Sequence, residues 1–267
     1  MTMMQITHET LSLDCANIEL EIIRFIQKFV DDAKVLGVMV GLSGGIDSSV
    51  VGALCVKALG RDKVIGLLMP ARHTPKEDLD GATDLVKNWG VRSYRVDIDQ
   101  IFCTLLDSIP AKAEHKIAHG NAKARIRMTI LYYLANLFKF AVAGTGDRSE
   151  DMIGYFTKYG DGGVDFLPIA HLYKTQVRML ASHLGLPQEL VQKPSSPQLW
   201  PAQKATDEIP IDYDRLDLVL HGLFDVGLTP EQVSVRTGVP RGIVDETVKR
   251  HAESQHKRTY PPMVRPW

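Results

Sequence analysis

The residues best suited to chemistry form the string SGGIDSS at positions 43–49. A glycine-rich turn that leads into a helix presents backbone N–H groups and the positive end of the helix dipole to an anion. Ser43, Ser48 and Ser49 add hydroxyl donors. Asp47 places a carboxylate beside bound phosphates, where a bridging Mg²⁺ would remove the repulsion. Turns and helix caps of this composition also occur without ligands, but the full string after a buried strand favours a phosphate-binding loop.

This loop differs from the Walker loop GxxxxGK[ST], because no lysine follows its last glycine. The difference disfavours ordinary ATPase or kinase chemistry.

The elements around the loop alternate between strand and helix. Continuous apolar runs predict strands at 35–42, 63–69 and 140–144, and a further strand is expected at 91–98. Helices are predicted at 18–30, 50–59 and 121–139. A further helix should start at Thr74, Pro75 and Glu77, with a cap, a proline and a capping-box acid. We therefore expect an α/β fold: a doubly wound parallel sheet of about five strands, with helices on both faces. Its ligand site should lie at the carboxyl ends of the strands.

Beyond residue 170 the pattern turns mainly helical. Helices are predicted at 173–184, 213–224 and 241–256, with a second Thr-Pro start at Thr229 and Pro230. Residues 193–201 form a proline-rich break between them. We expect one domain over residues 1–267, made of an ATP-binding core at 18–170 and a helical part at 171–267.

Composition excludes several classes of protein. The 267 residues are 45% hydrophobic and carry a net charge of −1, so no global field attracts a nucleic acid. Three widely spaced cysteines argue against a disulfide framework or a zinc site. No apolar run is long enough for a membrane span, and no export signal is visible. A cytoplasmic protein is expected.

The SGGxDSS loop resembles that of the ATP pyrophosphatase family, which implies attack on the α-phosphate of ATP. Four further strings are similar to NAD⁺ synthetases: GNAKARIRM at 120–128, GTGDRSE at 144–150, FTKYGDGGVD at 156–165 and HKR at 256–258. The resemblance covers about residues 18–258 and implies an adenine nucleotide alpha hydrolase-like fold. It departs from the usual pattern at residues 146–149, at Ser196 and at Gln255.

The resemblance implies roles for particular residues. Asp47 and Glu150 would bind Mg²⁺, and Asp47 and Lys174 would be catalytic. The ATP-binding residues would be Gly41, Leu42, Ser43, Gly44, Gly45, Ile46, Asp47, Ser48, Thr145, Lys174 and Ser196. The residues that bind deamido-NAD⁺ would be Arg125, Lys158, Asp165, His256 and Lys257.

Simpler interpretations remain open at several of these positions. Arg125 and Arg127 share a helix with an apolar face, so one of them could be only a solvated side chain, and the family pattern alone selects Arg125. Glu150 could merely complement a helix dipole, as could His256 and Lys257.

The reaction implied is ATP-dependent amidation of deamido-NAD⁺ by ammonia, through an acyl adenylate, in a homodimer. The chain is too short to carry an amidase domain as well, so free ammonia is the expected donor. A tRNA-modifying ATP pyrophosphatase would need catalytic cysteines or a basic surface. A nucleotide-binding regulatory module would not need the acids Asp47 and Glu150.

Overall fold

The computed structural model describes residues 5–111, 113–196, 199, 200, 203 and 205–264. In this part of the chain, four parallel strands form one sheet in the order β3-β2-β1-β4. The strands are β1 (Val38–Gly41), β2 (Val64–Leu68), β3 (Arg92–Arg95) and β4 (Ala141–Ala143). In the centre of the sheet, Val38 of β1 lies opposite Val64 on one side and Ala141 on the other.

The expected fold is confirmed, but the described residues form four strands rather than about five. A fifth segment only begins to pair with the edge strand β4: Phe166 forms a single parallel bridge with Ala143. Pro168 follows two residues later and has no N–H to donate, so the ladder does not extend.

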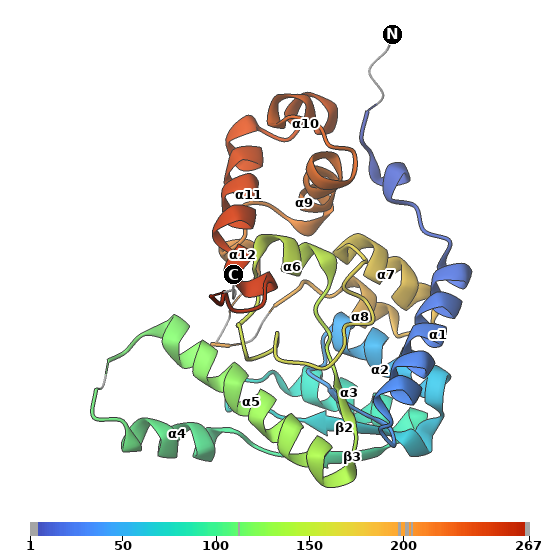
Figure 1. Cartoon of the computed structure of the whole chain (residues 1–267), viewed down its shortest axis with the longest axis vertical. Helices are drawn as coiled ribbons and strands as arrows, with labels where there is room; N and C mark the ends of the chain where they lie inside the picture. The colour runs from blue at the N-terminus through green and yellow to red at the C-terminus, as the bar shows by residue number, and fades with distance from the viewer. Residues whose placement is uncertain (1–4, 112, 197–198, 201–202, 204, 265–267) are drawn as a thin grey trace.

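Both faces of the sheet are covered, because side chains of β1 alternate between two apolar clusters. Val38 and Val40 belong to one cluster and Met39 to the other. The first face packs against α1 (Cys15–Ala33), α2 (Ile46–Leu59), α3 (Lys76–Trp89) and α7 (Lys174–His183). The second face packs against α5 (Lys116–Phe138), which in turn contacts α4 (Asp99–Ser108). Figure 1 shows α5 lying across the sheet.

After β4, the regular elements of the described residues are all helices. These elements are α6 (Arg148–Ile153), α7, α8 (Gln188–Gln192), a 3-10 turn at Ala205–Asp207, α9 (Tyr213–Leu220), α10 (Pro230–Thr237), α11 (Arg241–Glu253) and α12 (Gln255–Arg258). The helix expected at 213–224 is α9 followed by a π turn at His221–Asp225. Figure 1 shows α9, α10 and α11 grouped beyond α6, away from the sheet. Of the proline-rich break at 193–201, residues 197, 198 and 201 lie outside the described residues.

The two Thr-Pro sequences behave differently. Thr229 caps α10 as predicted, and the Gln232 side chain completes a capping box. The cap predicted at Thr74 is wrong, because α3 begins two residues later at Lys76 with no side-chain cap. The Thr74 hydroxyl instead accepts a hydrogen bond from the Ala71 amide at 2.9 Å, which closes a turn of the loop after β2.

Two further features are the state of the cysteines and the character of the helices. Cys15, Cys55 and Cys103 are all free thiols. Among the described residues, no helix combines the length and the apolar character that a membrane crossing requires.

Candidate functional site

The glycine-rich loop lies at the point where the strand order reverses. The chain leaves β1 for its neighbour β2 on one side, and β4 lies on the other side of β1. This is the position at which open α/β sheets hold ligands. Gly44 has φ of +78°, and a Cβ atom there would lie 2.3 Å from the carbonyl oxygen of Asp78 in α3. Only glycine allows the loop to turn and pack so closely.

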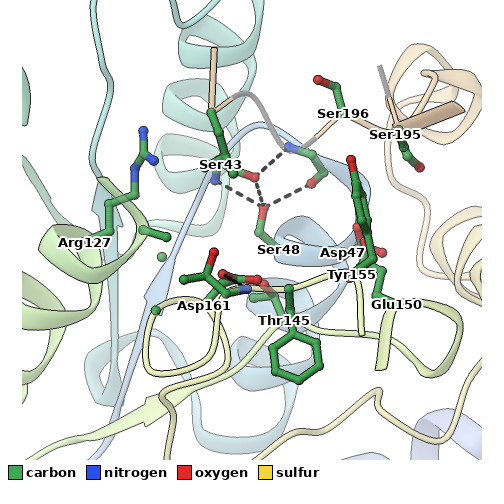
Figure 2. A pocket seen from close by; sticks show the side chains of 18 of the residues that line it. Ser43, Asp47, Ser48, Arg127, Thr145, Glu150, Tyr155, Asp161, Ser195 and Ser196 are labelled. Atoms are coloured by element: carbon green, nitrogen blue, oxygen red, sulfur yellow. Dashed lines mark hydrogen bonds between the residues drawn. The ribbon is translucent and has the colours of Figure 1, made fainter. Parts of the chain in front are cut away.

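The serines of the loop hold its shape through hydrogen bonds (Figure 2). The Ser48 hydroxyl accepts from the Ser43 amide at 3.2 Å and lies 3.1 Å from the Ser43 hydroxyl. The Ser43 hydroxyl also accepts from the Gly45 amide at 3.2 Å. Ser49 is buried, and its hydroxyl donates to the carbonyl of Gly45, four residues back, at 2.9 Å, instead of offering a donor to a ligand.

A cavity of about 470 Å³ opens beside this loop. Most residues predicted to bind ATP or metal line it: Gly41, Leu42, Ser43, Gly45, Ile46, Asp47, Ser48, Thr145, Glu150 and Ser196. Of the residues predicted to bind the dinucleotide, Lys257 is among the lining residues. Gly44 packs against α3, and Lys174 lies behind Asp47 and Glu150.

Lys174 is the centre of the charged part of the site. Its side chain is 0% exposed, and its Nζ lies 2.7 Å from Asp47, 2.9 Å from Asp147 and 2.9 Å from Glu150. The face of the Tyr213 ring is 5.1 Å from the same ammonium. Three separate segments, at the starts of α2, α6 and α7, therefore meet at one cation.

The charges in this cluster do not balance. Burial disfavours a charged lysine, yet Asp147, Asp47 and Glu150 hold the pKa of Lys174 well above its ordinary value. Three carboxylates around one ammonium carry a formal charge of −2. Burial raises the pKa of Glu150, and the neighbouring Asp147 and Asp47 raise it further although Lys174 opposes this. Lys174 stays charged, and the excess negative charge falls on the acids.

The cluster fits a divalent cation. Asp47 Oδ1 is buried and has no hydrogen-bond partner among the described residues, and a charge of +2 would neutralise the cluster. The described residues contain no group of three or more His, Cys, Asp or Glu side chains that could hold a metal alone. Mg²⁺ commonly takes one or two carboxylates and completes its shell with water and phosphate oxygens. Asp47 and Glu150 could supply such a pair.

The two arginines of α5 have different surroundings. Arg125 is exposed, and its Nε and Nη2 donate to the Lys158 carbonyl at 3.3 and 3.2 Å. Arg127 lines the cavity, and its Nε donates to the Met69 carbonyl at 3.0 Å. Figure 2 shows Arg127 on the side of the cavity away from Asp47 and Glu150. Arg127 was not a predicted binding residue, and only the tertiary contact with the end of β2 reveals it.

Three other residues predicted to bind the dinucleotide, Lys158, Asp165 and His256, are not among the residues that line the cavity. Lys158 Nζ donates to the His256 carbonyl at 2.5 Å. Asp165 accepts from the Tyr132 hydroxyl at 3.0 Å and from the Val142 amide at 2.7 Å. Lys257 connects the two regions, because it lines the cavity while its Nζ donates to the Gly154 and Phe156 carbonyls at 2.6 and 2.8 Å.

Asp147 is the clearest functional candidate that sequence reasoning missed. One of its oxygens caps α6 by accepting from the Glu150 amide at 2.8 Å, and the other faces Lys174. An acid three residues before Glu150 is the pattern of a helix cap, so the local signal was present. Its contact with Lys174 depends on the tertiary fold.

A phosphate-binding loop at the switch point of a parallel sheet, with a lysine and acids beside it, defines a nucleotide-binding α/β protein. Comparison with known proteins narrows this class. The family model for NAD synthase matches residues 18–261. The chain is 49% identical to an NH(3)-dependent NAD(+) synthetase from Staphylothermus marinus, with 93% of this chain and 91% of the relative covered. It is 48% identical to the enzyme of the same description from Hyperthermus butylicus, with 98% and 96% covered.

Solved structures agree with these relatives. An NMN synthetase from Francisella tularensis superposes with a TM-score of 0.84 at 28% identity, covering 95% of this chain and 99% of the other. An NH3-dependent NAD synthetase from Campylobacter jejuni, in complex with nitrate, superposes with a TM-score of 0.81 at 29% identity, covering 95% and 100%. The chain belongs to the NAD synthase family.

Proposed function

We propose that this chain makes NAD⁺ from deamido-NAD⁺, ATP and ammonia, and releases AMP and pyrophosphate. This is the last step of NAD⁺ biosynthesis. The observation that carries the proposal is the meeting of Lys174, Asp47 and Glu150 beside the serine-rich loop. It puts cationic and metal-binding groups next to the place where phosphates would lie.

In the proposed reaction, the nicotinate carboxylate attacks the α-phosphorus of ATP and pyrophosphate leaves, which forms an acyl adenylate. Ammonia then attacks the activated carbonyl carbon and AMP leaves. Ser43, Gly45 and Ser48 line the part of the cavity where the phosphates would lie, in a loop whose shape is preset by its own hydrogen bonds. Lys174 supplies positive charge to the leaving pyrophosphate, because its charge is maintained by the acids around it.

Asp47 and Glu150 would hold Mg²⁺. The unpartnered Asp47 Oδ1 and the uncompensated negative charge of the cluster support this assignment. When bound, the metal would neutralise phosphate oxygens during the transfer. Asp147 stays behind Lys174 and keeps its ammonium in place.

The dinucleotide would lie along the outer side of α5, where Arg125 and Lys158 are connected to His256 through backbone carbonyls. In the same helix, Tyr133 is 68% exposed and Leu137 is 64% exposed. We propose that a second copy of the chain covers this surface, so that the enzyme is a homodimer with its dinucleotide site near the interface. A Leu137→Glu variant should then sediment as a monomer, whereas a wild type that sediments as a monomer at working concentration would contradict the dimer.

The proposed setting is a reducing, cytoplasmic one, because all three cysteines are free thiols. A net charge of −1 gives no support for a nucleic-acid partner.

The assay that tests the function measures NAD⁺ formation from deamido-NAD⁺, ATP and Mg²⁺, with ammonium or glutamine as the donor. We expect product with ammonium and none with glutamine alone. The similarity to an NMN synthetase makes nicotinic acid mononucleotide the competitor substrate to include. A higher kcat/KM for the mononucleotide than for deamido-NAD⁺ would show that the mononucleotide is the preferred substrate and would contradict the proposal.

The matched variants are Asp47→Asn and Asp62→Asn. Asp47 lines the cavity, whereas the Asp62 side chain is 96% exposed at the surface. Loss of one acid from the metal pair should lower kcat about a hundredfold or more in Asp47→Asn, since it removes about 3 kcal/mol of charge stabilisation. Asp62→Asn should behave as wild type. Equal activity of the two variants would refute the role of Asp47.

A further inference from the structure

Asp217 is a buried carboxylate that no step of the proposed reaction uses. It lies in α9 of the helical part, is 0% exposed, and accepts three hydrogen bonds. The donors are the Ser149 hydroxyl at 2.6 Å and both the amide and the hydroxyl of Thr175 at 2.8 Å. Burial raises the pKa of Asp217 to about 7, and the bonds from Ser149 and Thr175 oppose that rise. A lone buried acid would be costly, so three donors converging on it form a built arrangement.

The partners of Asp217 are the chain neighbours of the two site residues. Ser149 precedes Glu150 in α6, and Thr175 follows Lys174 in α7. The Ser149 hydroxyl also accepts from the Lys174 amide at 2.9 Å. One carboxylate therefore holds the first turns of α6 and α7 together from behind, on the side away from the cavity.

These hydrogen bonds constrain the distance between Lys174 and Glu150. Lys174 Nζ is 2.9 Å from Glu150, and the two residues belong to different helices. The described contacts that connect these helix starts include the ion pairs of Lys174 with Asp147 and Glu150, and a hydrogen bond from the Arg148 amide to the Leu172 carbonyl at 2.9 Å. They also include the hydrogen bonds through the Asp217 carboxylate and the Ser149 hydroxyl. Mg²⁺ and ATP would compete for the ion pairs when they bind, whereas the connection through Asp217 is buried and would persist.

We propose that Asp217 is a positioning residue, which keeps Lys174 and Glu150 at the separation that binding of metal-bound ATP requires. The proposal rests on the proposed function only through the roles of Lys174 and Glu150. It assigns the helical part a direct share in building the nucleotide site.

The experiment compares Asp217→Ala and Asp217→Asn with Thr247→Val. Thr247 is also 0% exposed in the helical part, and its hydroxyl donates only to the Ile243 carbonyl of its own helix at 2.9 Å. Thr247→Val therefore serves as a control for general destabilisation. Asparagine can still accept from Thr175 and donate to the Ser149 hydroxyl, so Asp217→Asn should restore most of the lost binding.

The readout is the dissociation constant of a non-hydrolysable ATP analogue with Mn²⁺, followed by the electron paramagnetic resonance of the free ion, well below each variant's Tm. We expect Asp217→Ala to weaken this binding about tenfold or more, which is the effect of losing hydrogen bonds to a charged group. In the assay with ammonium, kcat should fall while the KM for deamido-NAD⁺ stays unchanged, because the hydrogen-bond partners of Asp217, Ser149 and Thr175, are not among the residues proposed to bind it.

Equal analogue affinity in Asp217→Ala and Thr247→Val, at matched Tm, would overturn the proposal. If Asp217→Ala does not fold, Ser149→Ala removes the central hydroxyl of the connection, and it should still weaken binding relative to Thr247→Val. A wild type that binds the analogue with Mn²⁺ but forms no NAD⁺ would contradict the proposed function alone, since the binding comparison does not depend on the second substrate.

Discussion

At the scale of single residues, the site is organised by the charge of Lys174. A lysine with no exposed side chain is rare unless its charge is compensated. Here three acids compensate it, and they do so in excess. The same side chain therefore stabilises the fold and prepares the site for a cation and a triphosphate.

Replacing Lys174 with methionine should destabilise the protein by about 3–5 kcal/mol, because Asp47, Asp147 and Glu150 lose the one cation that the described residues place among them. The measurement is urea unfolding, and Mg²⁺ should recover more stability in the variant than it adds to the wild type. The control is Lys28→Met, since Lys28 is exposed and pairs with a single surface acid, Asp32. Unfolding midpoints that match in the two variants would show that Lys174 is not compensated as described.

The reactivity of the cysteines tests whether the Cys55 thiol is buried. Burial raises the pKa of Cys55 to about 12, whereas Cys103 is exposed. Since the thiolate is the nucleophile, a raised pKa means slow reaction: at pH 8 only about one Cys55 thiol in ten thousand is ionised. Iodoacetamide at pH 8 should therefore label Cys103 in the folded protein and Cys55 only after unfolding, as read by mass spectrometry. Rapid labelling of Cys55 in the folded state would contradict its burial in α2.

At the scale of elements, the turn between β1 and α2 depends on its contact with α3. The loop passes so close to Asp78 that a side chain at position 44 has no space. The geometry of the phosphate-binding loop is thus set partly by a helix that follows the next strand.

Gly44→Ala and Gly60→Ala separate this contact from backbone strain. Both glycines have similar φ, +78° and +79°, but a Cβ atom at Gly60 would meet nothing within 4 Å. Both variants should be destabilised by the strain of an alanine at positive φ. Gly44→Ala should be destabilised by a further 1–3 kcal/mol, roughly the cost of overpacking. Calorimetric stability and ATP affinity should both fall further in Gly44→Ala. Equal losses would mean that α3 does not constrain the loop.

At the scale of the whole molecule, the first helix of the helical part, α7, packs into the α/β core, whereas α9, α10 and α11 bury apolar residues in clusters of their own. Val177 and Leu180 of α7 belong to the same buried cluster as Val38 and Val50. Asp217 adds a polar connection between α9 and the starts of α6 and α7. We therefore predict that residues 1–267 behave as a single domain.

Calorimetry tests this prediction, because one cooperative unit gives one unfolding transition with equal calorimetric and van't Hoff enthalpies. Mg²⁺ with an ATP analogue should shift that transition upward as a whole, since binding to the folded state stabilises every part coupled to it. Two transitions, with only one of them shifted by the nucleotide, would show that the helical part unfolds separately.

Features with a local cause could be predicted from the sequence. Apolar runs located β1, β2 and β4, and the string SGGIDSS located the phosphate-binding loop, because backbone sterics and helix capping act over a few residues. The helix start at Thr229 and Pro230 was predicted for the same reason. The similar prediction at Thr74 was wrong, because the Thr74 hydroxyl accepts a hydrogen bond from the Ala71 amide instead of capping the helix.

The assembly of the site was decided by the tertiary structure. Lys174 and Asp47 are separated by 127 residues, and no local pattern encodes their contact. Arg125 and Arg127 lie on different sides of α5, but this helix buries apolar residues against the sheet and also exposes Tyr133 and Leu137. Its periodicity therefore does not identify the inward side, and only packing against the end of β2 determines that Arg127 faces the cavity.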